Sequence, residues 1–358
     1  FASCENLNDE KIQNDYLFIG LDSILGHKDE YNIFKSISFF ERSSEMGNSI
    51  ASYILGNLYQ KGEGIDQDFN KSVYYYKKSF EQGNTYALNR IGLCYYHGFG
   101  VERNYTKAVE YFEKAIDSGD YDAITNLGFC YHSGYGVDQN YTKSIELYER
   151  AAKLGKTDSL NNLAYCYTNG EGVERNYTKA FEYYQIAASL GEPDAINNLA
   201  SAYLDGQGVD KNATKAIEIF EKGIKIGNSY SMLNLGLIYY YGDDVDANYT
   251  KALELFENAA KLGNIEALNN LADCYLSGNI VHKNVTKAIE YLKRAARFGD
   301  PSALDKISMI LDNNNEIWVF TIIHMEFKVV EWIKYDSLYA INEKMHKNLL
   351  LLLLLLLF

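Results

Sequence analysis

A 36-residue period is the feature that most constrains how this chain can fold. Eight consecutive repeats, from residue 15 to residue 302, follow one another without an insertion or a deletion. They begin at Asp15, Ala51, Ala87, Ala123, Ser159, Ala195, Ser231 and Ala267. A fixed period of about 20–50 residues is typical of proteins in which copies of one supersecondary unit stack on one another. The period therefore predicts a solenoid.

Glycine marks two stops in every repeat. One series comprises Gly26, Gly62, Gly98, Gly134, Gly170, Gly206, Gly242 and Gly278, and the other comprises Gly47, Gly83, Gly119, Gly155, Gly191, Gly227, Gly263 and Gly299. Each glycine follows an apolar stretch with helical spacing, such as Ile124, Leu127 and Tyr131. Gly ends helices readily because it adopts the left-handed conformation without steric cost. Each repeat is therefore predicted to hold two helices, and the fold to be all-α.

A small residue recurs in the first helix of every repeat, and bulky pairs such as Tyr111 with Phe112 recur in the second helix. The small residues are Gly20, Gly56, Gly92, Gly128, Ala164, Ala200, Gly236 and Ala272. We expect them to let the second helix approach the first closely. Because one short helix pair cannot bury its apolar face alone, neighbouring repeats must stack into a continuous core.

One motif is common to the repeats. In the repeat that begins at Ala123 it reads Ala-x-x-Asn-Leu-Gly-x-x-Tyr-x-x-Gly-x-Gly-Val, and Asn-x-x-Lys follows from Asn140. This motif resembles the Sel-1-like repeat, a tetratricopeptide-like repeat of the HCP-like group. The resemblance covers residues 15–302 and implies a right-handed α-α superhelix (solenoid) of about eight 36-residue helix-turn-helix repeats. The first repeat departs most, with Ser23 in place of the Tyr.

The resemblance also implies a class of function. We expect a non-catalytic scaffold or adaptor that binds protein or peptide partners in the concave groove of the solenoid. The alternative is an endoplasmic-reticulum adaptor of a membrane ubiquitin ligase in the degradation of misfolded proteins, and an enzyme of unknown type is a more distant hypothesis. No enzymatic activity, catalytic residue or cofactor is expected.

A ladder of asparagines marks the expected binding face of the first helices. Its members are Asn126, Asn162, Asn198, Asn234 and Asn270, preceded by Arg90, and Asn89 lies beside them. Asn offers donors and an acceptor, which suits the backbone amides of an extended peptide. Alternatively, these asparagines make hydrogen bonds between repeats. The sequence leaves both interpretations open.

Four of the five cysteines share one repeat position: Cys94, Cys130, Cys166 and Cys274, with Cys4 outside the repeats. Equivalent positions of adjacent repeats lie on the order of 10 Å apart, whereas a disulfide needs Cα atoms within ~7 Å. We therefore expect buried free thiols and no disulfides. Pairing Cys94 with His97, or Cys130 with His132, completes no set of four ligands, so no metal site is expected.

Charge and hydropathy limit the partners and the compartment. The net charge of −14 argues against nucleic acid as a partner, because a nucleic-acid-binding surface needs clustered Lys and Arg side chains.

Residues 303–358 form a degenerate ninth repeat or cap and a Leu-rich tail, and we expect residues 1–14 to be an N-terminal fragment. The run Leu349–Phe358 is short of the ~20 residues that span a bilayer, so membrane association is disfavoured. The compartment is unknown, with the cytoplasm favoured and the endoplasmic-reticulum lumen as the alternative.

An Asn-x-Thr sequence recurs just before the second helix in six repeats, at Asn104, Asn140, Asn176, Asn212, Asn248 and Asn284. These asparagines are either glycosylation acceptors or helix N-caps. The N-cap interpretation is favoured because Asp68 occupies the same position and Asp also caps helices. A lysine recurs three residues later, from Lys35 to Lys287. The helix dipole disfavours a cation there, so we expect a packing or ion-pair role for it.

Overall fold

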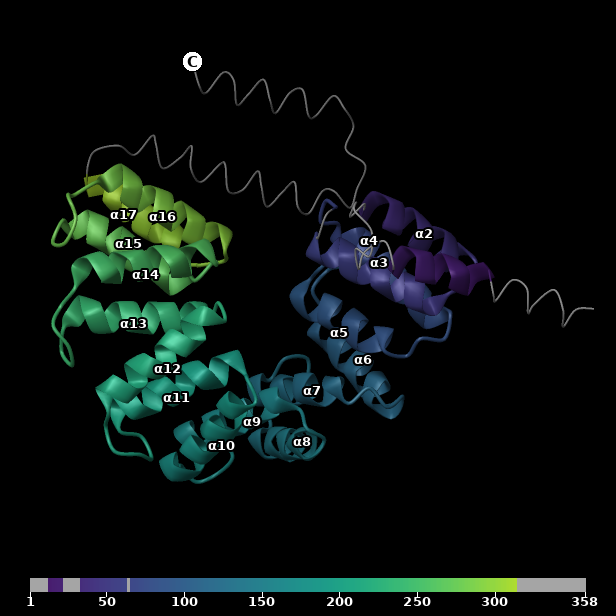
Figure 1. The fold of residues 1–358 in the computed structure, drawn as a ribbon, viewed down its shortest axis with the longest axis horizontal. Helices are drawn as coiled ribbons and strands as arrows, with labels where there is room; N and C mark the ends of the chain where they lie inside the picture. The colour runs from purple at the N-terminus through teal and green to yellow at the C-terminus, as the bar shows by residue number, and fades with distance from the viewer. Residues whose placement is uncertain (1–11, 22–32, 63–64, 314–358) are drawn as a thin grey trace, which may run out of the picture. The chain divides into compact units, whose positions relative to one another are not determined.

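The computed structural model describes residues 12–21, 33–62 and 65–313, and every regular element within these ranges is an α-helix (Figure 1). Residues 12–21 are helical, and they are followed by α2 (Ile33–Glu45), α3 (Ser49–Lys61), α4 (Phe69–Glu81), α5 (Ala87–His97), α6 (Tyr105–Asp117), α7 (Asp122–Ser133), α8 (Tyr141–Lys153), α9 (Thr157–Asn169), α10 (Tyr177–Ser189), α11 (Pro193–Asp205), α12 (Ala213–Lys225), α13 (Ser229–Tyr241), α14 (Tyr249–Lys261), α15 (Ile265–Ser277), α16 (Val285–Arg297) and α17 (Ala303–Asn313). The predictions for Cys4 and for the leucine run fall outside the described residues.

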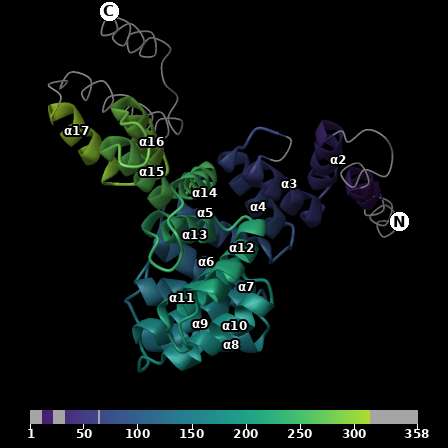
Figure 2. The same cartoon turned by 60° about the vertical axis from the view of Figure 1, so that its left-hand side comes forward.

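The helices pack as successive pairs. Within each unit the first helix of a repeat packs on the second, as α9 does on α10 and α15 does on α16, and the second helix packs on the first helix of the next repeat, as α10 does on α11 (Figures 1 and 2). The chain separates into two compact units, an N-terminal unit ending at Ala216 and a C-terminal unit starting at Ile217. Each unit is a stack of helix pairs. The prediction of an all-α solenoid of helix-turn-helix repeats is confirmed.

Glycine ends the first helices in the way the sequence predicts. Gly134 lies in the left-handed region at φ 72°, and its N–H donates to the Cys130 carbonyl oxygen. The equivalent residues that follow α3, α5, α9, α11, α13 and α15 also lie in this region: Gly62, Gly98, Gly170, Gly206, Gly242 and Gly278. After Gly134 the Asn140 N–H donates to the Tyr131 carbonyl oxygen at 2.8 Å, so this loop runs back along the helix that it leaves.

The small residue of the first helix lies against a buried ring of the second helix. A Cβ atom added to Gly92 would lie 2.6 Å from the Phe112 ring, and one added to Gly128 would lie 2.7 Å from the Tyr148 ring. Residues 12–21 and α2 repeat the arrangement, with 2.6 Å between such a Cβ on Gly20 and the Phe40 ring. The prediction that small residues permit close helix approach is therefore confirmed at these glycines.

The helix α17 is the first helix of the degenerate ninth repeat that the sequence predicts. It packs on α16, and its Ile307 side chain is buried in a cluster with Ala272, Ala288 and Leu292. The apolar face of the last complete repeat is thus covered by a further helix. Residues 314–358 lie outside the described part of the chain.

Candidate peptide-binding face

The Asn-x-Thr asparagines act as N-caps of the second helices. In α8, for example, the Asn140 Oδ1 atom accepts a hydrogen bond of 2.9 Å from the Lys143 N–H, and Asp68 does the same for Lys71 at 3.0 Å. Equivalent bonds of 2.9 to 3.0 Å are made by Asn104, Asn176, Asn212, Asn248 and Asn284. The N-cap interpretation is confirmed. Glycosylation is a separate matter, because the cap uses the side-chain oxygen whereas a glycan would attach to the nitrogen.

The recurring lysine is explained by an aromatic ring. Lys179 Nζ lies 4.2 Å from the centroid of the Tyr167 ring and donates to the Tyr167 hydroxyl at 2.6 Å. The same arrangement of Lys over Tyr occurs for Lys71 with Tyr59, Lys107 with Tyr95, Lys143 with Tyr131, Lys251 with Tyr239 and Lys287 with Tyr275. The cation therefore bridges the two helices of one repeat. This attraction offsets the unfavourable placement of a positive charge in the first helical turn.

Asparagines of the ladder join neighbouring repeats. In the N-terminal unit, Asn126 Nδ2 donates to Asn89 Oδ1 at 2.9 Å, and Asn198 Nδ2 donates to Asn161 Oδ1 at 3.0 Å. Arg90 Nε donates to the Tyr53 hydroxyl at 3.0 Å in the same way. All three pairs are 37 residues apart. The inter-repeat alternative therefore holds for these residues, which are buried or half-buried rather than fully exposed.

Asn162 differs from its neighbours in the ladder. Its carboxamide is half-buried and makes no hydrogen bond to another described group of the protein. The residue that would pair with it across the repeats is Thr125, whose Oγ1 atom instead donates to Asp158 Oδ1 at 3.4 Å. One residue in this part of the ladder thus keeps both its donor and its acceptor available.

The C-terminal unit carries its own part of the ladder. Asn234 and Asn270 are half-buried there. Asn269, next to Asn270, donates to Asp300 Oδ2 at 2.7 Å and accepts from Lys306 Nζ at 3.0 Å. Asn269 and Asp300 also line a surface depression of about 420 Å³ together with Ser229, Tyr230, Leu262, Gly263, Asn264, Ile265, Glu266 and Ser302.

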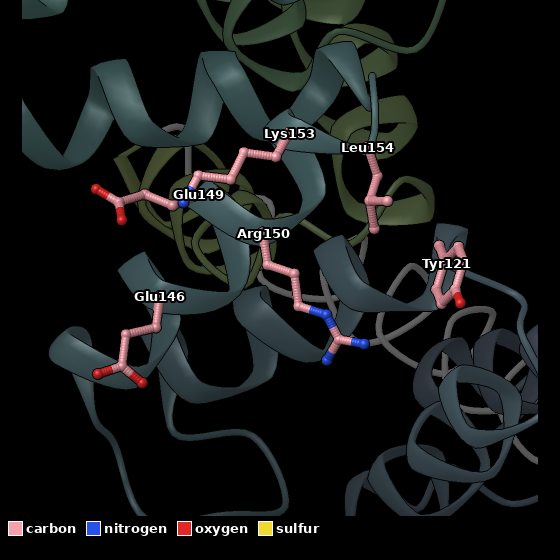
Figure 3. A pocket seen from close by; sticks show the side chains of 6 residues that line it. All are labelled: Tyr121, Glu146, Glu149, Arg150, Lys153 and Leu154. Carbon is pink, nitrogen blue, oxygen red and sulfur yellow. The ribbon is translucent and has the colours of Figure 1, made fainter.

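A second depression, of about 370 Å³, lies away from the ladder. It is lined by Tyr121, Glu146, Glu149, Arg150, Lys153 and Leu154, four of which belong to the second helix α8 (Figure 3). Its side chains mix both signs of charge, and Figure 3 shows the Glu146 carboxylate on the opposite side from Tyr121. No residue of the predicted asparagine ladder lines it, so the two surfaces are distinct.

The four described cysteines are free and buried. Burial raises the pKa of the Cys94, Cys130 and Cys166 thiols to about 12 and that of Cys274 to about 11. A thiol with so high a pKa is a weak nucleophile at neutral pH. Cys94, Cys130 and Cys274 act as small apolar core residues.

Sequence reasoning missed one grouping. His132 Nε2 lies 2.6 Å from Glu171 Oε2, and the Cys166 thiol completes a cluster whose ligand atoms all lie within 4.8 Å of one another. The sequence pairs His132 with Cys130, which is two residues away, but in the structure its partners come from the next repeat. Cys166 and Glu171 lie 34 and 39 residues after His132, so a search at separations close to one period, rather than at neighbouring positions, would have found them.

Comparisons with known proteins place the repeat in a family. The Sel1 repeat pattern matches residues 49–84, 85–120, 122–156, 157–192, 193–228, 229–264 and 265–300. These seven matches leave out the first of the eight predicted repeats, which departs most from the motif. No curated protein sequence matches the chain.

Within the described residues, no helix has the length and apolar character needed to cross a membrane.

Several solved structures are similar. A protective antigen of uropathogenic Escherichia coli with an SLR fold is 29% identical, with 87% of this chain and 68% of that chain covered and a TM-score of 0.53. A Sel1 repeat protein from Oxalobacter formigenes is 26% identical, with 83% and 86% covered and a TM-score of 0.51. Yeast Tom70, at 17% identity, with 90% and 67% covered and a TM-score of 0.52, shows similarity of fold alone.

Proposed function

The chain belongs to the Sel1 repeat family, and from this premise we propose that it is a non-catalytic scaffold whose first helices bind an extended segment of a protein partner. The Sel1 repeat fold is typically a protein-interaction scaffold. Stacked helical repeats provide an extended binding surface because each repeat adds the same face to its neighbour's. The partner that suits this surface is a protein or a peptide.

The observation that supports a peptide-binding role is the Asn162 carboxamide, which makes no hydrogen bond to the described groups of the protein. It lies between Asn126 and Asn198 in the ladder of the N-terminal unit, and the Asn126 oxygen is also unused by the described groups around it. A side-chain amide with a free donor and a free acceptor can pair with both the C=O and the N–H of a peptide backbone. Such pairing gives affinity without selecting a side-chain sequence.

The inter-repeat hydrogen bonds prepare this surface. They fix Asn126 and Asn198 to Asn89 and Asn161, so that the carboxamides on either side of Asn162 hold one orientation before a partner arrives. A face ordered in advance loses less conformational entropy on binding. The two interpretations of the ladder are therefore compatible: Asn126 and Asn198 join neighbouring repeats, and Asn162 is available to a peptide.

The test is an Asn162→Ala variant of the full chain, measured for binding to a library of extended peptides. We expect weaker binding by about 1 kcal/mol per lost hydrogen bond, or roughly fivefold, with an unchanged unfolding midpoint. Gln185→Ala is the matched control, because Gln185 presents an exposed carboxamide on the second helix α10. Unaltered binding by Asn162→Ala, or equal losses in both variants, would exclude the ladder as the binding face.

A further inference from the structure

Two neighbouring repeats bring together three side chains that ligate metals. His132 belongs to the last turn of α7, Cys166 to the last turn of α9, and Glu171 to the loop that follows α9. Their ligand atoms lie within 4.8 Å of one another. We propose that this cluster binds a divalent transition-metal ion of the zinc class, at a site separate from the asparagine ladder.

The helix end of α9 places two of the ligands. Gly170 turns the chain back in the left-handed conformation at φ 75°, and the Glu171 N–H then donates to the Cys166 carbonyl oxygen at 3.0 Å. This turn holds the Glu171 carboxylate near the Cys166 thiol. Stacking of the repeats supplies the third ligand, His132, from the preceding first helix.

The donor set selects the class of metal. A thiolate, an imidazole and a carboxylate suit Zn²⁺, whereas Mg²⁺ and Ca²⁺ prefer oxygen ligands alone. Metal–ligand bonds of about 2.0–2.3 Å in a tetrahedron separate the ligand atoms by roughly 3.3–3.7 Å. The His132–Glu171 distance of 2.6 Å therefore has to widen by less than about 1 Å. Three protein ligands leave the fourth position to a water molecule.

Aromatic rings surround the histidine of the cluster. Rings of Tyr141, Tyr165 and Phe129 lie around the His132 imidazole, with centroids 5.2, 5.9 and 6.3 Å away. These rings hold the imidazole in place beside Glu171, although Phe129 and Tyr165 are themselves exposed to solvent. The His132 and Glu171 side chains remain 16% and 27% exposed, which gives the ion a path to the thiol.

Only one of the four described cysteines has this environment. At the positions equivalent to His132 and Glu171, Cys94 has Gln60 and Phe99, Cys130 has Tyr96 and Tyr135, and Cys274 has Tyr240 and Asn279. A buried cysteine is thus sufficient for packing in every one of these repeats. The additional His and Glu are what distinguish Cys166, and the other cysteines serve as internal controls.

Binding requires no electron transfer. The metal forms bonds to Cys166 Sγ, a His132 ring nitrogen and a Glu171 carboxylate oxygen, and the thiol proton passes to the solvent. The hydrogen bond between His132 and Glu171 is replaced by the two metal bonds. The site then carries the charge of one thiolate, one carboxylate and one dication, which sum to zero.

Cobalt(II) is the probe, because a thiolate bound to it gives a charge-transfer absorption band. The full chain, with Cys4→Ser to remove the cysteine outside the described residues, is freed of metal with a chelator and titrated with Co²⁺ and then Zn²⁺. We expect one Co²⁺ per chain with the thiolate band, and its displacement by Zn²⁺. Cys166→Ser should abolish the band, while Cys130→Ser should retain it.

Two further variants keep the test decisive if Cys166→Ser fails to fold. His132→Gln and Glu171→Gln change partly exposed side chains, and each should weaken Co²⁺ binding at least about tenfold with an unchanged circular dichroism spectrum. The proposal is overturned by the absence of a thiolate band, by a band that survives Cys166→Ser, or by unchanged affinity in both folded variants. None of these outcomes depends on peptide binding by the ladder.

Discussion

Lys179 Nζ lies 4.2 Å from the centroid of the Tyr167 ring, so that the first turn of one helix is tied to the last turns of its partner. The lysine backbone takes part as well, because its N–H donates to the Asn176 cap at 2.9 Å. One residue therefore links the loop cap, the second helix and the first helix. The same contact between the two helices of a repeat occurs in six of the repeats.

The Lys–Tyr contact predicts a measurable coupling. Lys179→Met keeps the length of the side chain but removes its charge, and Tyr167→Leu removes the ring. A double-mutant cycle of these changes should give a coupling of about 0.5–1 kcal/mol in the free energy of unfolding, measured with urea. Tyr167→Phe separates the ring from the hydroxyl and should keep most of the coupling. A coupling of zero would mean that the lysine recurs for another reason.

The N-cap predicts that Asn and Asp are interchangeable where Asn and Ala are not. Asn140→Ala should lower the free energy of unfolding by about 1 kcal/mol, because the Lys143 N–H loses its acceptor. Asn140→Asp should preserve stability, as Asp68 already caps α4 in the same geometry. Thr142→Ala is the control, since it destroys the Asn-x-Thr sequence and leaves the cap. Equal losses for Thr142→Ala and Asn140→Ala would contradict the prediction.

The contact between Gly92 and Phe112 predicts an unfavourable Gly→Ala substitution inside a helix. Alanine normally stabilises a helix by up to about 1 kcal/mol relative to glycine. At Gly92 the added Cβ would lie 2.6 Å from a ring that is 1% exposed, so overpacking should outweigh this gain and destabilise the chain by about 1–2 kcal/mol. Thermal unfolding of Gly92→Ala measures the effect. Adding Phe112→Leu should reduce the penalty; a penalty that persists undiminished would place its cause elsewhere.

The sequence by itself determined the features that depend on residues within one repeat. Gly134 ends its helix, Asn140 caps the next and Gly128 admits the Tyr148 ring, and each of these follows from backbone conformation or from the packing of one helix pair. Such relationships recur at a fixed spacing along the chain. The period of 36 residues therefore reveals them without coordinates.

Only the tertiary structure decided which side chains of different repeats meet. The offset between neighbouring helix pairs brings residues 37 positions apart into contact, and Asn198 therefore forms a hydrogen bond with Asn161. Thr125, which is 37 residues before Asn162, instead donates its hydroxyl hydrogen bond to Asp158. Asn162 is therefore left without a hydrogen-bond partner among the described groups. The same stacking sets His132 beside Glu171 of the next repeat. These contacts depend on the packing distance and angle between helices, which a periodic pattern along one chain does not encode.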